Sequence, residues 1–296
     1  MIINQATLQS IYRGFKVIYN QAFQSAKPLY DQVATTIPST TKEEEYKWLG
    51  KVPRMREWIG DRIIENLGAY GYTIKNKDWE ATVAIDRNDI EDDTIGVYTP
   101  IIQSLGDSAA THPDEIIFPL LLGGFNTLCY DGQYFFDAEH KDGDSPIQSN
   151  VSNKKLTPEA YGAARANMLS LLDEKGKPLN IVPNLLVVPP QLEDTAKQIL
   201  MADTINGTTN IYKGSAQLLM VPYLATNPTA WFLLCTTKPV KPLIFQRRKQ
   251  PEFVSMDKPE NENVFMKKQF IYGVDSRDNA GYGLWQLAYG STGEVA

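Results

Sequence analysis

The chain has very few residues that could carry acid–base, redox or metal chemistry: two histidines and two cysteines in 296 residues. A Ser/His/Asp or Cys/His catalytic arrangement needs His112 or His140 as its base, and no G-x-S-x-G motif accompanies either residue. Cys129 and Cys235 match no C-x-x-C or zinc spacing and lie in apolar stretches, so we predict that both are buried and reduced. We therefore expect no catalytic residue, no metal ligand and no cofactor.

An excess of positive charge and long apolar runs are also missing. The 35 acidic and 29 basic residues give a formal net charge of -6. This charge disfavours general adhesion to DNA or to an anionic membrane, because both are negative as well. No apolar run is long enough to span a bilayer, and the first residues lack the pattern of a secretory signal. We expect an intracellular protein with no membrane partner and only weak contact with nucleic acid.

The composition is that of a soluble globular protein, with 43% hydrophobic and 22% charged residues. An apolar stripe in residues 1–40 predicts a helix followed by an extended linker. Thr99-Pro100 begins a helical region that Gly123-Gly124 ends, and because His112-Pro113 kinks or restarts it, this region is either one long kinked helix or two helices in tandem. Further helices are expected from Thr157 to about residue 172 and over 191–202. Strands are expected in the sequences IVPNLLVV, LLMVPYL, AWFLLCTT and PVKPLIF. Because helices and strands alternate without a regular βαβ repeat, the predicted fold class is α+β.

Two local patterns predict pairs of strands. Apolar residues alternate from Tyr70 to Ile74 and again from Trp79 to Ile85, with KNKD between them, which favours a β-hairpin. Near the C-terminus, the sequence DSRDNAGYG is expected to form a turn between two strands.

The stretch FFDAEHKDGDSP, residues 135–146, is the best candidate for chemistry. Its acidic residues do not match the EF-hand spacing, and a lone histidine beside glycine and proline does not match a zincin. Asp-Gly-Asp at 142–144 is typical of a turn, so a solvated loop is the favoured interpretation. A casual cation site and a catalytic role remain open. The alternative function would be a metal-dependent hydrolase that uses Asp137, Glu139 and His140.

The segment from 42 to 65 is densely charged but nearly neutral, contains two tryptophans, and cannot form one helix because of Pro53. Tryptophan, methionine and arginine are the residue types enriched at protein interfaces. We therefore predict a subunit interface at Lys47, Trp48, Arg54, Arg56, Trp58, Asp61 and Arg62.

A basic run without acidic residues extends from 238 to 250. It predicts either a contact with phosphate or an acidic partner, or simply a solvated strand end. The residues of this possible inner-surface basic patch are Lys241, Arg247, Arg248 and Lys249.

Several long phrases occur together in a characteristic order. They are PSTTKEEEYKWLGKVPRMREWIGDR, YTIKNKDWEATVAIDRNDIEDD, GVYTPIIQSLGDSAATHPDE, CYDGQYFFDAEH, KPLIFQRRKQPEF and DSRDNAGYGLWQLAYG. Over nearly the whole chain, this order closely resembles the family of major head subunits of Mu-like phages and prophages, the gpT family. The resemblance implies a major capsid protein with the Hong Kong 97 type phage capsid fold. None of the segments is by itself a catalytic motif.

The resemblance also implies a division of the chain. Residues 1–40 would be the N-terminal arm, 41–78 the extended loop, 79–125 the peripheral domain strand and spine helix, 126–245 the axial domain, and 246–296 a C-terminal return to the peripheral domain.

Partners and localisation follow from the same resemblance. The chain would assemble with copies of itself as pentamers and hexamers into an icosahedral shell, in the cytoplasm of a bacterial host, and would end in the virion capsid. A separate scaffolding protein and a portal would take part in assembly, and packaged DNA would be contacted weakly. Another virion component, such as a portal or decoration protein, is the alternative within this class.

Overall fold

The computed structural model describes residues 4–49, 71–92, 95–141, 145–258 and 260–295, and its architecture is α+β. The α-helices are α1 (Gln5–Ser25), α2 (Arg87–Glu91), α3 (Thr99–Gly123), α4 (Pro158–Ser170), α5 (Glu193–Met201) and α6 (Glu262–Lys267). Short 3₁₀ helices are η1 (Tyr30–Gln32), η2 (Ile95–Tyr98), η3 (Pro190–Leu192), η4 (Pro222–Leu224) and η5 (Trp285–Leu287).

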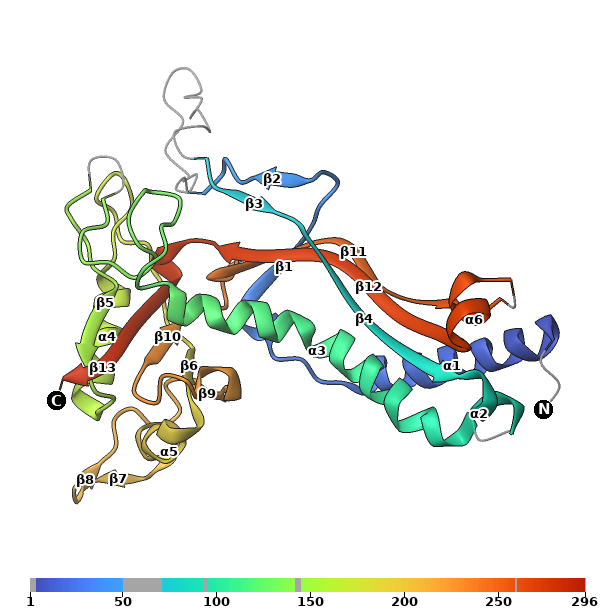
Figure 1. Cartoon of the computed structure of the whole chain (residues 1–296). Coiled ribbons are helices and arrows are strands. Elements are labelled where there is room, and N and C mark those ends of the chain that lie inside the picture. Colours follow the sequence, from blue (N-terminus) through green and yellow to red (C-terminus); the bar gives the residue numbers. More distant parts are fainter. Residues whose placement is uncertain (1–3, 50–70, 93–94, 142–144, 259, 296) are drawn as a thin grey trace.

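A long four-stranded sheet has the order β1-β11-β12-β4. Its strands are β1 (Ala34–Pro38), β4 (Lys77–Asp86), β11 (Leu243–Met256) and β12 (Gln269–Tyr282). Strand β1 runs parallel to β11, and the other pairs are antiparallel. Figure 1 shows β11, β12 and α3 running side by side along most of the length of the molecule. This assembly forms an extended spine.

The end of the spine that carries α1, called the far end below, has a hydrophobic core of its own. Helix α1 lies against α3, and it buries one stripe consisting of Leu8, Ile11, Phe15 and Tyr19. This stripe meets aromatic side chains of the sheet: Phe15 contacts Tyr272 edge-on, with ring centroids 5.1 Å apart, and Tyr19 stacks on Phe253. Burial of such rings supplies most of the cohesion of this end of the molecule.

A second, five-stranded sheet has the order β5-β13-β10-β6-β9. Its strands are β5 (Val151–Lys154), β6 (Leu185–Val188), β9 (Gln217–Met220), β10 (Trp231–Leu234) and β13 (Ala288–Val295). Every residue of the central strands β6 and β10 is buried. The more compact part of the molecule in Figure 1 is built around this sheet. Two small sheets pair β2 (Glu43–Glu45) with β3 (Thr73–Lys75) and β7 (Thr204–Ile205) with β8 (Thr208–Thr209).

The predicted helices are confirmed. Helix α3 is one continuous helix from Thr99, and it ends at Gly123 as expected, although Pro113 and Pro119 lie inside it. Helix α4 begins after Thr157, whose hydroxyl accepts a hydrogen bond from the backbone N–H of Ala160. After α1, however, the expected linker is wrong in part, because β1 is a strand of the long sheet.

The predicted β-hairpin over residues 70–85 is wrong. Strand β3 pairs with β2, whereas β4 pairs with β12 in the long sheet. Between them, the buried Asn76 donates from Nδ2 to the Ser39 hydroxyl and the Thr41 carbonyl oxygen. These bonds hold the backbone between β3 and β4, so the chain continues from the small sheet into the long sheet and makes no hairpin turn. Alternating apolar residues indicate two strands but do not identify their partners.

The predicted turn near the C-terminus is wrong. All of DSRDNAGYG except its last residue forms the second half of β12, and its first part is paired on both sides, with Asp278 opposite both Lys77 and Arg247. The last strand, β13, joins the five-stranded sheet.

Helix α3 lies close to the backbone of α1 at Gly106. A Cβ atom at this position would lie 2.6 Å from the Tyr19 carbonyl oxygen. We expect Gly106→Ala to lower the free energy of unfolding of the unassembled chain by roughly 1–3 kcal/mol, because the two backbones must separate. Chemical denaturation measures this change.

Gly14 of α1 is the matched control, since a Cβ there meets nothing within 4 Å. Gly14→Ala should raise the stability by about 0.5–1 kcal/mol, the usual gain from alanine in a helix. Equal stabilisation by both variants would contradict the described α1–α3 contact.

Candidate functional site: the base of the extended loop, the basic run and a buried histidine

The predicted subunit interface lies only in part within the described residues. Arg54, Arg56, Trp58, Asp61 and Arg62 are outside them. Lys47 is exposed, and its ammonium lies 3.2 Å from a carboxylate oxygen of Glu45. Trp48 is half-buried and meets the Tyr46 ring edge-on, with ring centroids 6.1 Å apart. Strands β2 and β3 flank this segment, so they form its base.

A buried polar network attaches this base to the spine. The Tyr46 hydroxyl donates to Oε1 of Gln246 over 2.8 Å. The Gln246 amide nitrogen donates in turn to the Ile74 carbonyl oxygen and to Oδ1 of Asn76, at 3.1 and 2.7 Å. Because Gln246 is fully buried in β11, each of these bonds replaces one to water that has been lost. The sequence analysis missed this role, although a lone glutamine after the apolar LIF of β11 is a signal for it.

Glu44 closes the turn before β2. Its Oε1 accepts hydrogen bonds from the backbone N–H groups of Thr40 and Thr41 and from the hydroxyls of Ser39 and Thr41. The bond from the Thr40 N–H contributes most, and together these bonds lower the pKa of Glu44 to about 2. The carboxylate form thus organises the turn that leads into β2.

The four residues of the basic run do not form one unpaired surface. Lys249 lies 2.5 Å from Asp275 and 3.8 Å from Glu252. The Lys241 ammonium donates to the Asp31 carbonyl oxygen, and Arg248 donates to the Ser39 carbonyl oxygen at 3.4 Å.

Arg247, the fourth residue, is opposite Asp278 in the sheet, and its guanidinium lies 4.8 Å from the centre of the Phe245 ring. Each of the four side chains therefore has a contact within the chain, and for Lys249 this contact is an ion pair. The prediction of a basic patch on an inner surface stays a prediction.

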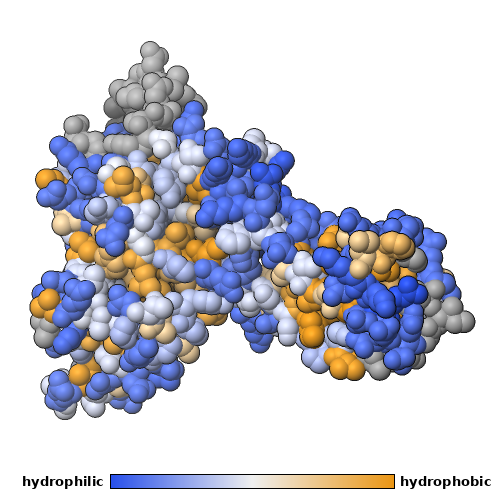
Figure 2. Space-filling view, viewed as in Figure 1, coloured by the Kyte–Doolittle hydropathy of each residue, from blue (hydrophilic) through white to orange (hydrophobic). Residues whose placement is uncertain are grey.

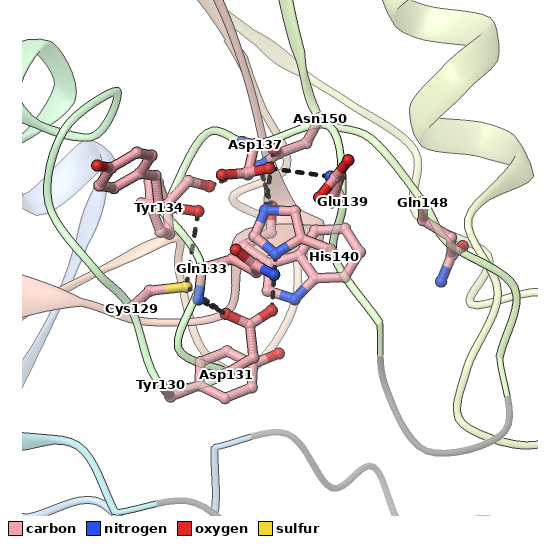
Figure 3. A network of polar contacts seen from close by, with 12 residues as sticks. Cys129, Tyr130, Asp131, Gln133, Tyr134, Asp137, Glu139, His140, Gln148 and Asn150 are labelled. Carbon is pink, nitrogen blue, oxygen red and sulfur yellow. Dashed lines mark hydrogen bonds and ion pairs between the residues drawn. The ribbon is translucent and has the colours of Figure 1, made fainter.

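The stretch 135–146 differs from its sequence-based interpretation. His140 is completely buried, as are Phe135 and Phe136, so the prediction of a solvated loop is wrong for these residues. The predicted turn at 142–144 lies outside the described residues. Figure 3 shows His140 at the centre of a polar network that also contains Asp131 and Asn150. The imidazole stacks on the Trp285 ring, with centroids 4.0 Å apart and planes 5° from parallel.

The orientation of Asn150 fixes one proton of the imidazole. Its Nδ2 donates to the carbonyl oxygens of Phe135, Trp285 and Ala288, so Oδ1 is the atom that faces His140. Because Oδ1 can only accept, the imidazole Nε2 at 3.2 Å carries a proton. The same Oδ1 accepts from the backbone N–H of Asp137.

The other imidazole nitrogen faces a carboxylate. Nδ1 of His140 lies 2.7 Å from Oδ2 of Asp131. Burial raises the pKa of Asp131, but the hydrogen bond and charge of His140 outweigh burial, so this pKa is below its ordinary value. Asp131 is therefore a carboxylate in the folded chain, and the His140 imidazole is its buried partner.

Cys129 completes a group that could in principle ligate a metal, together with Asp131 and His140. However, the thiol donates to Oδ1 of Asp131 over 3.1 Å, and burial raises the pKa of Cys129 far above that of a free thiol. Metal binding requires the thiolate, which this environment disfavours. The cluster is better described as a hydrogen-bonded junction that connects the 129–150 region to Trp285.

This geometry does not support the hydrolase alternative. His140 has no exposed surface, and both of its ring nitrogens are engaged. One carboxylate oxygen of Asp137 accepts from the backbone N–H of Glu139, which is a turn contact. A general base must reach a substrate, and His140 reaches none here.

Asn150 allows a test of the junction. We expect Asn150→Ala to lower the free energy of unfolding by roughly 3 kcal/mol, because it leaves several buried polar groups without partners. Asn153→Ala is the matched control; Asn153 lies three residues further along, in β5, and since it is exposed this change should be nearly neutral. Urea denaturation of both variants measures the difference. Equal, small effects would show that the junction contributes little.

Glu44 gives a prediction about pH. Its folded-state pKa is depressed from 4.5 to about 2. The stability it contributes is therefore complete above the unfolded-state pKa, and it is lost as the pH falls through the folded-state value. We expect the stability difference between the wild type and Glu44→Gln to shrink from about pH 4.5 to about pH 2, as measured by thermal unfolding. Glu43→Gln, a change of the exposed neighbour, should not show this loss. A difference that does not depend on pH would contradict the prediction.

Known proteins with similar sequences are phage head proteins. The family described as Mu-like prophage major head subunit gpT matches residues 8–155, 148–224 and 225–296. The Mu-like prophage FluMu major head subunit of Haemophilus influenzae is 34% identical over 97% of this chain and 74% of its own length. The major capsid protein of Escherichia phage Mu is 34% identical over 100% of this chain and 76% of its own length.

Solved structures lead to the same class. A chain in the procapsid of bacteriophage JBD30 aligns with a TM-score of 0.64 and 36% identity, covering 99% of this chain and 77% of that chain. A virus-like particle from Pyrococcus furiosus has a TM-score of 0.54 at 9% identity, covers 94% of this chain and 97% of that chain, and supports the fold alone. Within the described residues, no helix is both long enough and apolar enough to cross a membrane. The fold is the phage capsid fold of the Hong Kong 97 type, and the chain belongs to the family of Mu-like prophage major head subunits, which are structural proteins of the phage shell.

Proposed function

We propose that this major capsid protein assembles as pentamers and hexamers into an icosahedral shell that encloses phage DNA. The observation that carries the proposal is the likeness to a procapsid subunit over 99% of the chain. The long spine supports it, because an elongated subunit can contact several neighbours at once. A shell needs many modest contacts for each subunit, and these contacts must be weak enough to correct errors during assembly.

We assign the two sheets and the N-terminal segments to the domains of the capsid fold. We assign the long sheet with α3 to the peripheral domain, with α3 as the spine helix, and the five-stranded sheet to the axial domain around the five-fold and six-fold centres. Because β13 belongs to the five-stranded sheet, the axial domain would contain 288–295 as well as most of 126–245. Residues 1–40 keep the role of an N-terminal arm and 41–78 that of an extended loop over a neighbouring subunit.

The assembly partners are the finer part of the proposal. A separate scaffolding protein and a portal would act during assembly in the bacterial cytoplasm, as the family resemblance implies. Packaged DNA would be contacted only weakly, since the net charge of -6 repels it and Lys249 is already paired with Asp275.

Electron microscopy tests the proposal. The chain is expressed with and without candidate assembly proteins from the same phage genome, and closed shells of uniform diameter are the expected product. Shells in which this chain dominates the protein mass would also separate it from a portal or decoration protein. A chain that stays monomeric in every combination would overturn the proposal.

Charge reversal tests the extended loop. We expect Arg54→Glu, Arg56→Glu or Arg62→Glu to reduce the yield of shells strongly, while thermal unfolding of the isolated subunit changes little. The reason is that rim charges set the register between subunits. Particle yield in a sucrose gradient and the unfolding midpoint are the two measurements. An equal loss in both would place these residues in the subunit's own fold instead.

A further inference from the structure

Helix α6 presents two large apolar side chains to solvent at the far end of the spine. Phe265 is 82% exposed and Met266 is 68% exposed, whereas Asn263 and Val264 on the inner side of the same helix are buried. Figure 2 shows apolar surface on the narrow lobe that contains α6. Exposure of a phenylalanine to this degree is unfavourable in a subunit that remains alone.

Helix α6 is held firmly, so the exposure is not due to fraying. The amide of Asn263 donates to the Met256 and Gln269 carbonyl oxygens, at 2.9 and 2.7 Å, and so joins the end of β11 to the start of β12. Lys268 ends the helix with a φ of 53°, and its carbonyl oxygen accepts from the backbone N–H of Arg87 at 2.8 Å. Phe265 and Met266 are therefore presented in a fixed direction.

A second apolar surface lies at the same end, where η2 meets α3. Val97 is 72% exposed and Ile101 is 46% exposed. The Tyr98 hydroxyl donates to a carboxylate oxygen of Asp89, which fixes η2 against α2. In Figure 1, α2 and α6 lie on opposite sides of the tip formed by β4 and β12. The two surfaces therefore lie on different sides of this end of the molecule.

One edge of the α6 surface is basic and one edge of the η2–α3 surface is acidic. Exposed Lys267 and Lys268 follow the apolar pair of α6, whereas exposed Glu262 precedes it, and exposed Asp92 precedes the apolar pair of η2 and α3. Apolar centres with complementary charged rims are characteristic of specific protein interfaces. Two unlike surfaces on one chain form a head-to-tail contact, which can close into a ring or continue through a lattice.

We propose that α6 of one copy docks on the η2–α3 junction of a second copy, with Phe265 and Met266 against Val97 and Ile101. The proposal rests on self-assembly as described under the proposed function, and it identifies one contact of that assembly. Lys267 and Lys268 would lie near Asp92 of the second copy. The far end of the spine is then a contact point between neighbouring subunits.

Cysteine cross-linking tests the pairing, since the native Cys129 and Cys235 are buried. Full-length Phe265→Cys and Val97→Cys chains with different affinity tags are co-expressed, and the assembled particles are treated with a short bismaleimide. The expected product is a covalent dimer that carries both tags. Either variant alone should stay monomeric. Met266→Cys with Ile101→Cys provides a second pair if one of the first variants folds poorly.

The control pair combines Phe265→Cys with Ile211→Cys, because Ile211 is 79% exposed but lies between α5 and β9 in the compact part of the molecule. Three results would each overturn the docking. They are particles that lack the covalent dimer between positions 97 and 265, dimers formed between two copies of the same variant, and equal cross-linking of the control pair. If no particles form, the shell proposal fails separately. The pairing is then judged in concentrated soluble protein, where absence of the mixed dimer overturns it too.

Charge exchange provides an independent measurement on the same particles. Lys267→Glu should lower the cross-linked fraction about five-fold, which is the upper range for a rim ion pair. Asp92→Lys in the second copy should restore it. An unchanged fraction in the first variant would show that the rim charges do not meet.

Discussion

Tyr282 joins the long sheet to three other parts of the molecule. It is the last residue of β12, it is 1% exposed, and its hydroxyl donates to the Leu120 carbonyl oxygen near the end of α3. Its backbone N–H donates to the hydroxyl of Tyr72, next to β3. Its ring stacks on Phe135, with centroids 4.5 Å apart. One residue thus fixes α3, the β2–β3 pair and the 129–150 region relative to the long sheet.

The contacts of Tyr282 hold α3 and β12 in one arrangement. Close packing of this kind resists relative movement of the parts that it joins. The imidazole of His140 lies in the same region, and it contacts Asp131, Asn150 and Trp285. A buried polar network with all its partners favours one arrangement of these loops over others. The residue that looked most catalytic in the sequence is therefore part of the framework.

The sequence predicted local structure better than partners. Helix α3 was placed correctly because Thr99-Pro100 and Gly123 mark its ends by local backbone geometry. The hairpin over 70–85 was wrong, since the choice between β2 and β12 as partners depends on Asn76 and on residues nearly 200 positions away. The burial of His140 was also hidden, because its partners Asp131, Asn150 and Trp285 come from three separate segments. The family and its fold were recognisable from the order of characteristic sequence segments. The docking surface of α6 was not, because the exposure of Phe265 and Met266 is defined only in the folded chain.

The pairing of β4 with β12 also determines when the fold can form. Asp86 pairs with Gln269 and Lys77 with Asp278, so the long sheet is incomplete until the residues up to Asp278 have left the ribosome. At ordinary rates of synthesis this delay is roughly ten seconds or more. During that time β4 has no partner strand. Helix α6 cannot take its final position either, because Asn263 bonds to Gln269 at the start of β12. A nascent chain therefore cannot present the finished spine to its neighbours, and shell growth is restricted to completed subunits.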